Sequence, residues 1–79
     1  MKYRSRVDII AAILKAAETG AAKTRLSRVA RISFDQLLQD SYLPLLLSKG
    51  LLEHSKKDRV YRITDLGRMF LVKYQKIKI

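Results

Sequence analysis

The chain has 79 residues, 48% of them hydrophobic, so the sequence predicts one small domain with a single core. Seventeen Lys and Arg against seven Asp and Glu give a net charge of +10, which attracts polyanions such as nucleic acid or an anionic membrane surface. The absence of cysteine excludes disulfides and thiolate metal sites. No apolar stretch approaches the ~20 residues needed to span a bilayer.

The first predicted helix begins after Ser5, which has the spacing of a capping box with Asp8. Gly20 suits the left-handed position that follows the end of a helix. Apolar residues spaced three or four apart predict one buried face: Val7, Ile10, Ala11, Leu14 and Ala17.

Two further helices follow in a helix-turn-helix order. The second is predicted over residues 24–30, and its apolar face consists of Leu26, Val29 and Ala30. The third has Ser33 as its N-cap and runs to Lys49, before Gly50. Its apolar side begins with Phe34, Leu37 and Leu38. A proline inside a helix removes a hydrogen bond, so Pro44 predicts a kink or break near residues 40–44.

The second half of the chain predicts a hairpin and a last helix. Residues 51–54 and 60–63 are the predicted strands, with a polar turn over 55–58, and residues 22–23 are a candidate third strand. Thr64 is the expected cap of a C-terminal helix over residues 65–79. Gly67 is expected to permit close packing. The helix carries an apolar stripe of Leu66, Phe70, Tyr74 and Ile77. We expect Leu66 and Phe70 to cover the core, and Tyr74 and Ile77 to lie beyond it.

The predicted fold class is therefore mainly α with a small β-hairpin wing, a winged helix-turn-helix, over residues 1–79 as a single domain. Four stretches of the sequence carry a resemblance: Arg4-Ser5-Arg6-Val7-Asp8-Ile9-Ile10 with Ile13-Leu14; Ala22-Lys23-Thr24-Arg25-Leu26; Ile32-Ser33-Phe34-Asp35-Gln36-Leu37, followed by Tyr42-Leu43 and Lys49-Gly50-Leu51-Leu52-Glu53; and Tyr61-Arg62-Ile63-Thr64-Asp65-Leu66-Gly67-Arg68-Met69-Phe70-Leu71. In this order they resemble archaeal winged-helix transcription regulators, including the small basic crenarchaeal chromatin proteins that dimerise through a C-terminal helix. The chain departs from the family in a longer stretch around residues 38–41, followed by Pro44, and in a shorter last helix.

This arrangement predicts binding to double-stranded DNA, with the third helix in the major groove and the basic wing on the backbone. Ser33, Asp35, Gln36 and Gln39 are the candidate base contacts, since Gln pairs with adenine and Asp accepts from cytosine. Asp35 equally suits a simple complement to the helix dipole. Phosphate contacts are expected from three basic clusters and one hydroxyl: Arg4 and Arg6; Lys23, Thr24, Arg25, Arg28 and Arg31; Lys56, Lys57 and Arg59.

Other classes of function have less support in the sequence. One His and scattered carboxylates make no recognisable metal or catalytic motif, so we expect no enzyme activity, no metal and no cofactor. The aromatic residues fall mostly at core spacings, which disfavours base stacking on single strands or RNA. A winged helix that has lost DNA readout and docks a partner protein is the alternative, favoured by Asp35, Asp40 and Pro44.

A homodimer is expected because a domain this small is marginal on its own. The predicted dimer contact consists of Phe70, Tyr74 and Ile77. A frayed basic tail that touches only DNA is the alternative for the same segment. The expected setting is the cytoplasm, on the nucleoid, in transcription regulation or DNA organisation.

Overall fold

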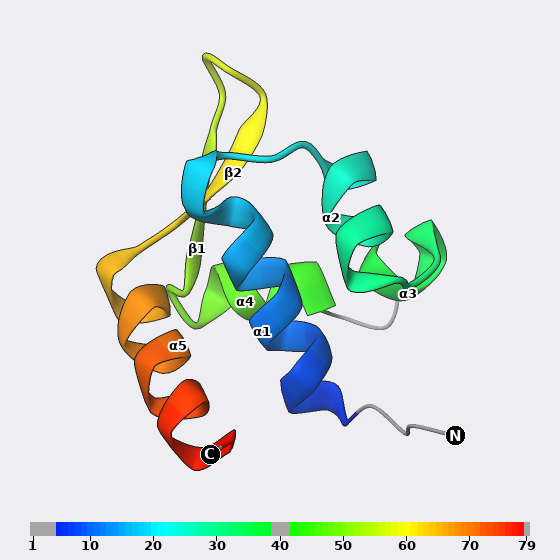
Figure 1. Ribbon diagram of the computed structural model, residues 1–79. Coiled ribbons are helices and arrows are strands. Elements are labelled where there is room, and N and C mark those ends of the chain that lie inside the picture. Colours follow the sequence, from blue (N-terminus) through cyan, green and yellow to red (C-terminus); the bar gives the residue numbers. More distant parts are fainter. Residues whose placement is uncertain (1–4, 39–41, 79) are drawn as a thin grey trace.

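The computed structural model describes residues 5–38 and 42–78 and has the predicted order of helices followed by a hairpin and a last helix (Figure 1). In Figure 1 the hairpin projects beyond the helices, and α1 lies between the α2–α3 pair and α5. The mainly α fold with one antiparallel hairpin confirms the predicted class. The elements are α1 (Arg6–Ala16), the short η1 turn (Ala17–Thr19), α2 (Lys23–Ala30), α3 (Phe34–Leu38), α4 (Tyr42–Ser48), β1 (Leu52–Ser55), β2 (Val60–Ile63) and α5 (Asp65–Lys78).

Helix α1 is the centre of the core and starts with the predicted capping box. The Ser5 hydroxyl accepts from the Asp8 N–H, and the Asp8 carboxylate accepts from the Ser5 N–H, both at 3.2 Å. Ile13 and Leu14 are fully buried. The prediction that Val7 is buried was wrong, because this residue lies in the first turn and is 47% exposed. The other elements bury residues of α1 only from Ala11 onward, namely Ala11, Ile13 and Leu14.

The second and third helices form a helix-turn-helix unit. Helix α2 starts one residue earlier than predicted and ends at Ala30; the C-cap residue Arg31 has a left-handed backbone (φ 57°) that turns the chain toward α3. The kink or break predicted near residues 40–44 falls partly on residues 39–41, which lie outside the described residues; the described helices are α3, which ends at Leu38, and α4, which begins at Tyr42. Pro44 is the third residue of α4, where a missing N–H breaks no intrahelical bond.

Two residues of the predicted apolar faces of this unit remain partly exposed to solvent. Val29 on α2 is 42% exposed and Phe34 on α3 is 43% exposed. The core is filled instead by Leu26, Ala30 and Leu37, which are fully buried on the same helices. Short helices bury a narrow stripe, so residues at its margin remain partly in solvent.

The hairpin is the wing of the fold. Strands β1 and β2 pair antiparallel, with Glu53 opposite Arg62 and His54 opposite Tyr61. The first strand starts at Leu52, one residue later than predicted. The expected third strand at residues 22–23 is reduced to one bridge, in which Ala21 and Tyr61 exchange two backbone hydrogen bonds of 3.0 and 2.8 Å. This bridge fixes the start of α2 beside the wing.

Helix α5 is fastened at both ends. The Thr64 hydroxyl accepts from the Gly67 N–H at 3.0 Å and donates to the Gly50 carbonyl at 2.6 Å, which confirms Thr64 as the cap. Near the other end, the Tyr74 hydroxyl donates to the Asp8 carboxylate on α1. Tyr74 is half-buried against the core, so the prediction that it lies beyond the globular body was wrong. Leu66, expected to cover the core, is 51% exposed.

Candidate nucleic-acid interface

The outward side of α2 carries three of the predicted DNA contacts. Leu26 and Ala30 fix the inward side of the helix, and helical spacing places Thr24, Arg25 and Arg28 on the opposite side, where all three are exposed. Arg31 follows directly at the left-handed turn and is exposed as well. The basic residues predicted around α2 are thus all accessible to a partner.

Helix α2 and the wing enclose a shallow hollow that joins two of the predicted clusters. Lys23 and Thr24 come from the start of α2, and Lys56 and Arg59 come from the wing. The bridge between Ala21 and Tyr61 brings these distant segments together. We call this the basic hollow; its lining is completed by Ala22, His54 and Tyr61, so it contains three cations and no carboxylate.

The opposite side of the hairpin has a different charge. Neighbouring residues of a strand point to opposite faces, so Glu53 and Arg62 lie on the face turned away from His54 and Tyr61. Glu53 and Arg62 line a second hollow together with Glu18, Asp65 and Arg68. Its two arginines are paired with carboxylates, Arg62 with Asp58 at 3.1 Å and Arg68 with Asp65 at 3.4 Å. The basic hollow is therefore the side of the wing whose cations have no carboxylate among the lining residues.

The turn between the two strands of the wing contains a residue with a left-handed backbone and three exposed basic side chains. Arg59 has a left-handed conformation (φ 57°), and its N–H donates to the Ser55 carbonyl at 2.7 Å. Lys56, Lys57 and Arg59 are all exposed, but Lys57 lies outside the basic hollow. His54 also lines the hollow, and the centroid of its ring lies 4.6 Å from that of the Tyr61 ring. The two rings lie together because His54 and Tyr61 are directly opposite each other in the antiparallel pairing of the strands.

The candidate base-reading residues on α3 have a role within the helix itself. The Ser33 hydroxyl accepts from the Gln36 N–H at 3.0 Å, and the Gln36 side-chain oxygen accepts from the Ser33 N–H at 2.9 Å. This reciprocal capping box occupies the oxygen that Gln36 would need for a two-bond contact with adenine. Asp35 is exposed in the first turn of α3. Gln39 lies outside the described residues.

The predicted N-terminal arm is only partly described. Arg4 lies outside the described residues. Arg6 is exposed at the start of α1, and its guanidinium carbon lies 4.9 Å from the centre of the Tyr42 ring. This cation–π contact links the start of α1 to the start of α4, so Arg6 is not brought into the basic hollow.

Within residues 5–38 and 42–78, no three His, Cys, Asp or Glu side chains gather as potential metal ligands. No helix within those same ranges is long and apolar enough to cross a membrane.

Comparison with known proteins agrees with the geometry. The sequence profile of a family described as winged helix-turn-helix matches residues 3–79. A solved structure, Sso10a-2, described as a DNA-binding protein from Sulfolobus solfataricus, is 25% identical; the match covers 95% of this chain and 82% of that chain, with a TM-score of 0.77. No curated protein sequence matches significantly. The predicted resemblance to archaeal winged-helix proteins is thereby confirmed.

Proposed function

This chain belongs to the winged helix-turn-helix family, and from that premise we propose that it binds double-stranded DNA as a transcription regulator or nucleoid-associated protein in the cytoplasm. Helix α3 enters the major groove, and the wing and α2 hold the flanking phosphates. The observation that carries the proposal is the basic hollow, in which Lys23, Lys56 and Arg59 converge from α2 and the wing. Sso10a-2, a DNA-binding protein with the same fold, supports it.

The number of exposed cations sets the expected salt dependence of DNA binding. Arg25 and Arg28 extend the basic surface along the outward side of α2, beside the hollow. If each protomer neutralises about four to six phosphates, log K falls against log salt with a slope of roughly −4 to −5 per protomer. The acidic residues Glu18, Glu53 and Asp65 lie on the other side of the hairpin and do not oppose the contact.

A duplex is favoured over single strands because the ring surfaces that stack on unpaired bases are mostly covered. Tyr42 and Tyr61 are 6% and 7% exposed, and Phe70 and Tyr74 are half-buried. Among the Phe and Tyr residues that the structure describes, only Phe34 is exposed. Proteins that bind single strands instead present successive aromatic platforms.

The proposal is tested by titrating labelled probes with the protein and following fluorescence anisotropy. The probes are a duplex of about two helical turns, long enough for two half-sites, each of its separated strands, and an RNA duplex of the same sequence. We expect the DNA duplex to bind more tightly than the other probes. Equal binding to single strands, or no binding to any probe at low salt, would contradict the proposal.

The second part of the proposal is a homodimer formed through α5. The predicted contact residues Phe70 and Tyr74 are engaged with the chain's own core, whereas Ile77 is 83% exposed. Met69 and Val72 are also more than half exposed, at 55% and 52%. A twofold-related copy would bury this exposed side of the helix and add to a small core.

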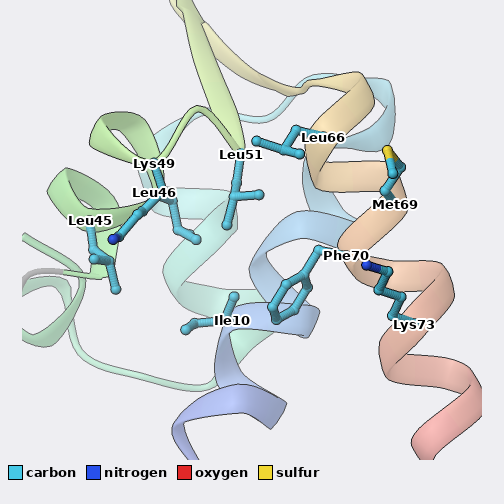
Figure 2. A pocket seen from close by; sticks show the side chains of 9 residues that line it. All are labelled: Ile10, Leu45, Leu46, Lys49, Leu51, Leu66, Met69, Phe70 and Lys73. Carbon is cyan, nitrogen blue, oxygen red and sulfur yellow. The ribbon is translucent and has the colours of Figure 1, made fainter.

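An apolar groove beside α5 supports the same dimer. Ile10 from α1 and Phe70 from α5 lie at the groove, which is flanked by Lys49 and Lys73 (Figure 2). An antiparallel pairing of two α5 helices places Ile77 of one copy near Leu66 and Met69 of the other. It also keeps the lysines near the C-terminal ends apart, whereas a parallel pairing would set them side by side. The groove is also lined by Leu45, Leu46, Leu51, Leu66 and Met69.

Sedimentation of the Met69→Lys variant tests the dimer. A charge buried at the pairing surface is costly, so we expect the wild type to be dimeric at high micromolar concentration and Met69→Lys to be monomeric. Val29→Lys is the matched control, because Val29 is a similarly exposed apolar residue on α2. If the wild type is monomeric, or if both variants dimerise equally, the α5 dimer is wrong.

A further inference from the structure

Phe34 occupies an unusual place for an aromatic side chain. It follows the N-cap Ser33 as the first residue of α3, and 43% of its surface is exposed. The core position on this helix is taken by Leu37, which is fully buried. Phe34 thus leaves a large apolar surface in water at the end of the helix whose first residues face base edges in helix-turn-helix proteins.

The side chains of the polar neighbours Ser33 and Gln36 already accept hydrogen bonds from backbone N–H groups. Ser33 and Gln36 bond each other's N–H groups in the capping box, at 3.0 and 2.9 Å. Breaking this box to contact a base would leave the first turn of α3 without its caps. The exposed side chains that remain in this turn are Phe34 and Asp35.

We propose that Phe34 contacts the C5 methyl group of thymine in the major groove and so makes the protein prefer thymine at one position of its site. This inference rests on the proposed function, in that α3 enters the groove. The thymine methyl is the apolar group that a base pair presents there, and apolar side chains, Phe among them, recognise it by contact. Pairing the two surfaces removes both from water, which favours the complex.

The test removes the methyl group from the DNA without changing base pairing. A preferred duplex is selected from a random pool, and its thymines are replaced one at a time by deoxyuridine. At the contacted position we expect wild-type binding to weaken about fourfold, the ratio that corresponds to about 0.8 kcal/mol for one buried carbon. Phe34→Ala is expected to bind the thymine and deoxyuridine duplexes equally well.

Two further variants make the result specific to Phe34. Val29→Ala removes a similarly exposed apolar side chain from α2 and is expected to keep the fourfold discrimination. Phe34→Leu keeps an apolar side chain and is expected to keep part of it, and circular dichroism verifies that each variant is folded.

The outcomes separate this inference from the proposed function. If the wild type binds all deoxyuridine duplexes as tightly as the thymine duplex, Phe34 does not read the methyl group, while DNA binding itself stands. An unchanged fourfold ratio in Phe34→Ala would also overturn the inference. Failure of the wild type to bind any duplex would instead remove the proposed function. The wild-type comparison needs no variant to fold.

Discussion

Replacing both Lys23 and Lys56 by glutamine is expected to weaken duplex binding about 30-fold at roughly 0.15 M salt. Each lost phosphate contact lowers the slope of log K against log salt by about 0.9, so the slope should fall by about 2 in magnitude. The effect is large because the two lysines approach the basic hollow from different elements, α2 and the wing, and so contribute separate contacts. Fluorescence anisotropy over a series of salt concentrations measures both quantities.

The matched control is the double variant Arg62→Gln/Arg68→Gln. It removes the same number of positive charges, but from the side of the hairpin where both arginines are paired with carboxylates. We expect its salt slope to stay close to that of the wild type. Equal losses in the two double variants would mean that only net charge matters and that the basic hollow is not the phosphate-binding side.

Gly67→Ala is expected to lower the free energy of unfolding by about 1–3 kcal/mol, as overpacking of a close contact does. A Cβ atom on Gly67 would press on the Leu51 carbonyl oxygen and lie 2.6 Å from Cγ1 of Ile63. At an uncrowded helical position the same change would raise stability by up to about 1 kcal/mol. The sign of the effect therefore reports how closely α5 approaches the base of the wing.

Urea-induced unfolding measures this difference. Gln75→Ala, an exposed position on the same helix, serves as the control and is expected to change stability by less than about 0.5 kcal/mol. If Gly67→Ala is as stable as the wild type or more stable, the close contact between α5 and Leu51 is wrong. The position in which α5 packs against the domain also determines which way its exposed apolar side faces. The stability of Gly67→Ala therefore also tests the geometry on which the proposed homodimer depends.

The features that the sequence predicted correctly are those set by local chemistry. The capping box of Ser5 and Asp8 and the cap at Thr64 depend on hydrogen bonds within a few residues. The place of Pro44 in the first turn of a helix follows from its covalent ring and its missing N–H, which that turn tolerates. Such features need no knowledge of what packs against the helix, and the order of elements follows from them.

The features that the sequence missed depend on contacts between distant segments. Helical spacing placed Val7 and Phe34 on apolar faces, but it gives no information about how far a neighbour covers each face. Tyr74 was assigned to a dimer because its partner, the Asp8 carboxylate, is remote in sequence. Gln36 was read as a base contact because a capping box and an adenine contact need the same residue type at the same place.

In the wing, too, the sequence predicted the local feature, the basic residues, but not their contact with a distant segment. The sequence identified Lys56 and Arg59 as basic wing residues but not the element that they face. The bridge between Ala21 and Tyr61 settles that point by setting the start of α2 against one side of the hairpin. Three cations then share one hollow, while Glu18, Glu53 and Asp65 gather on the other side.

If this winged helix binds duplex DNA through the basic hollow and the exposed cations of α2, the affinity for a duplex must depend steeply on salt. The labelled duplex is titrated with wild-type protein over a range of salt concentrations, beside its single strands. We expect tighter binding to the duplex and a slope of log K against log salt of roughly −4 to −5 per protomer. A flat salt dependence, or no duplex binding at low salt, would contradict it and favour a protein-docking role instead.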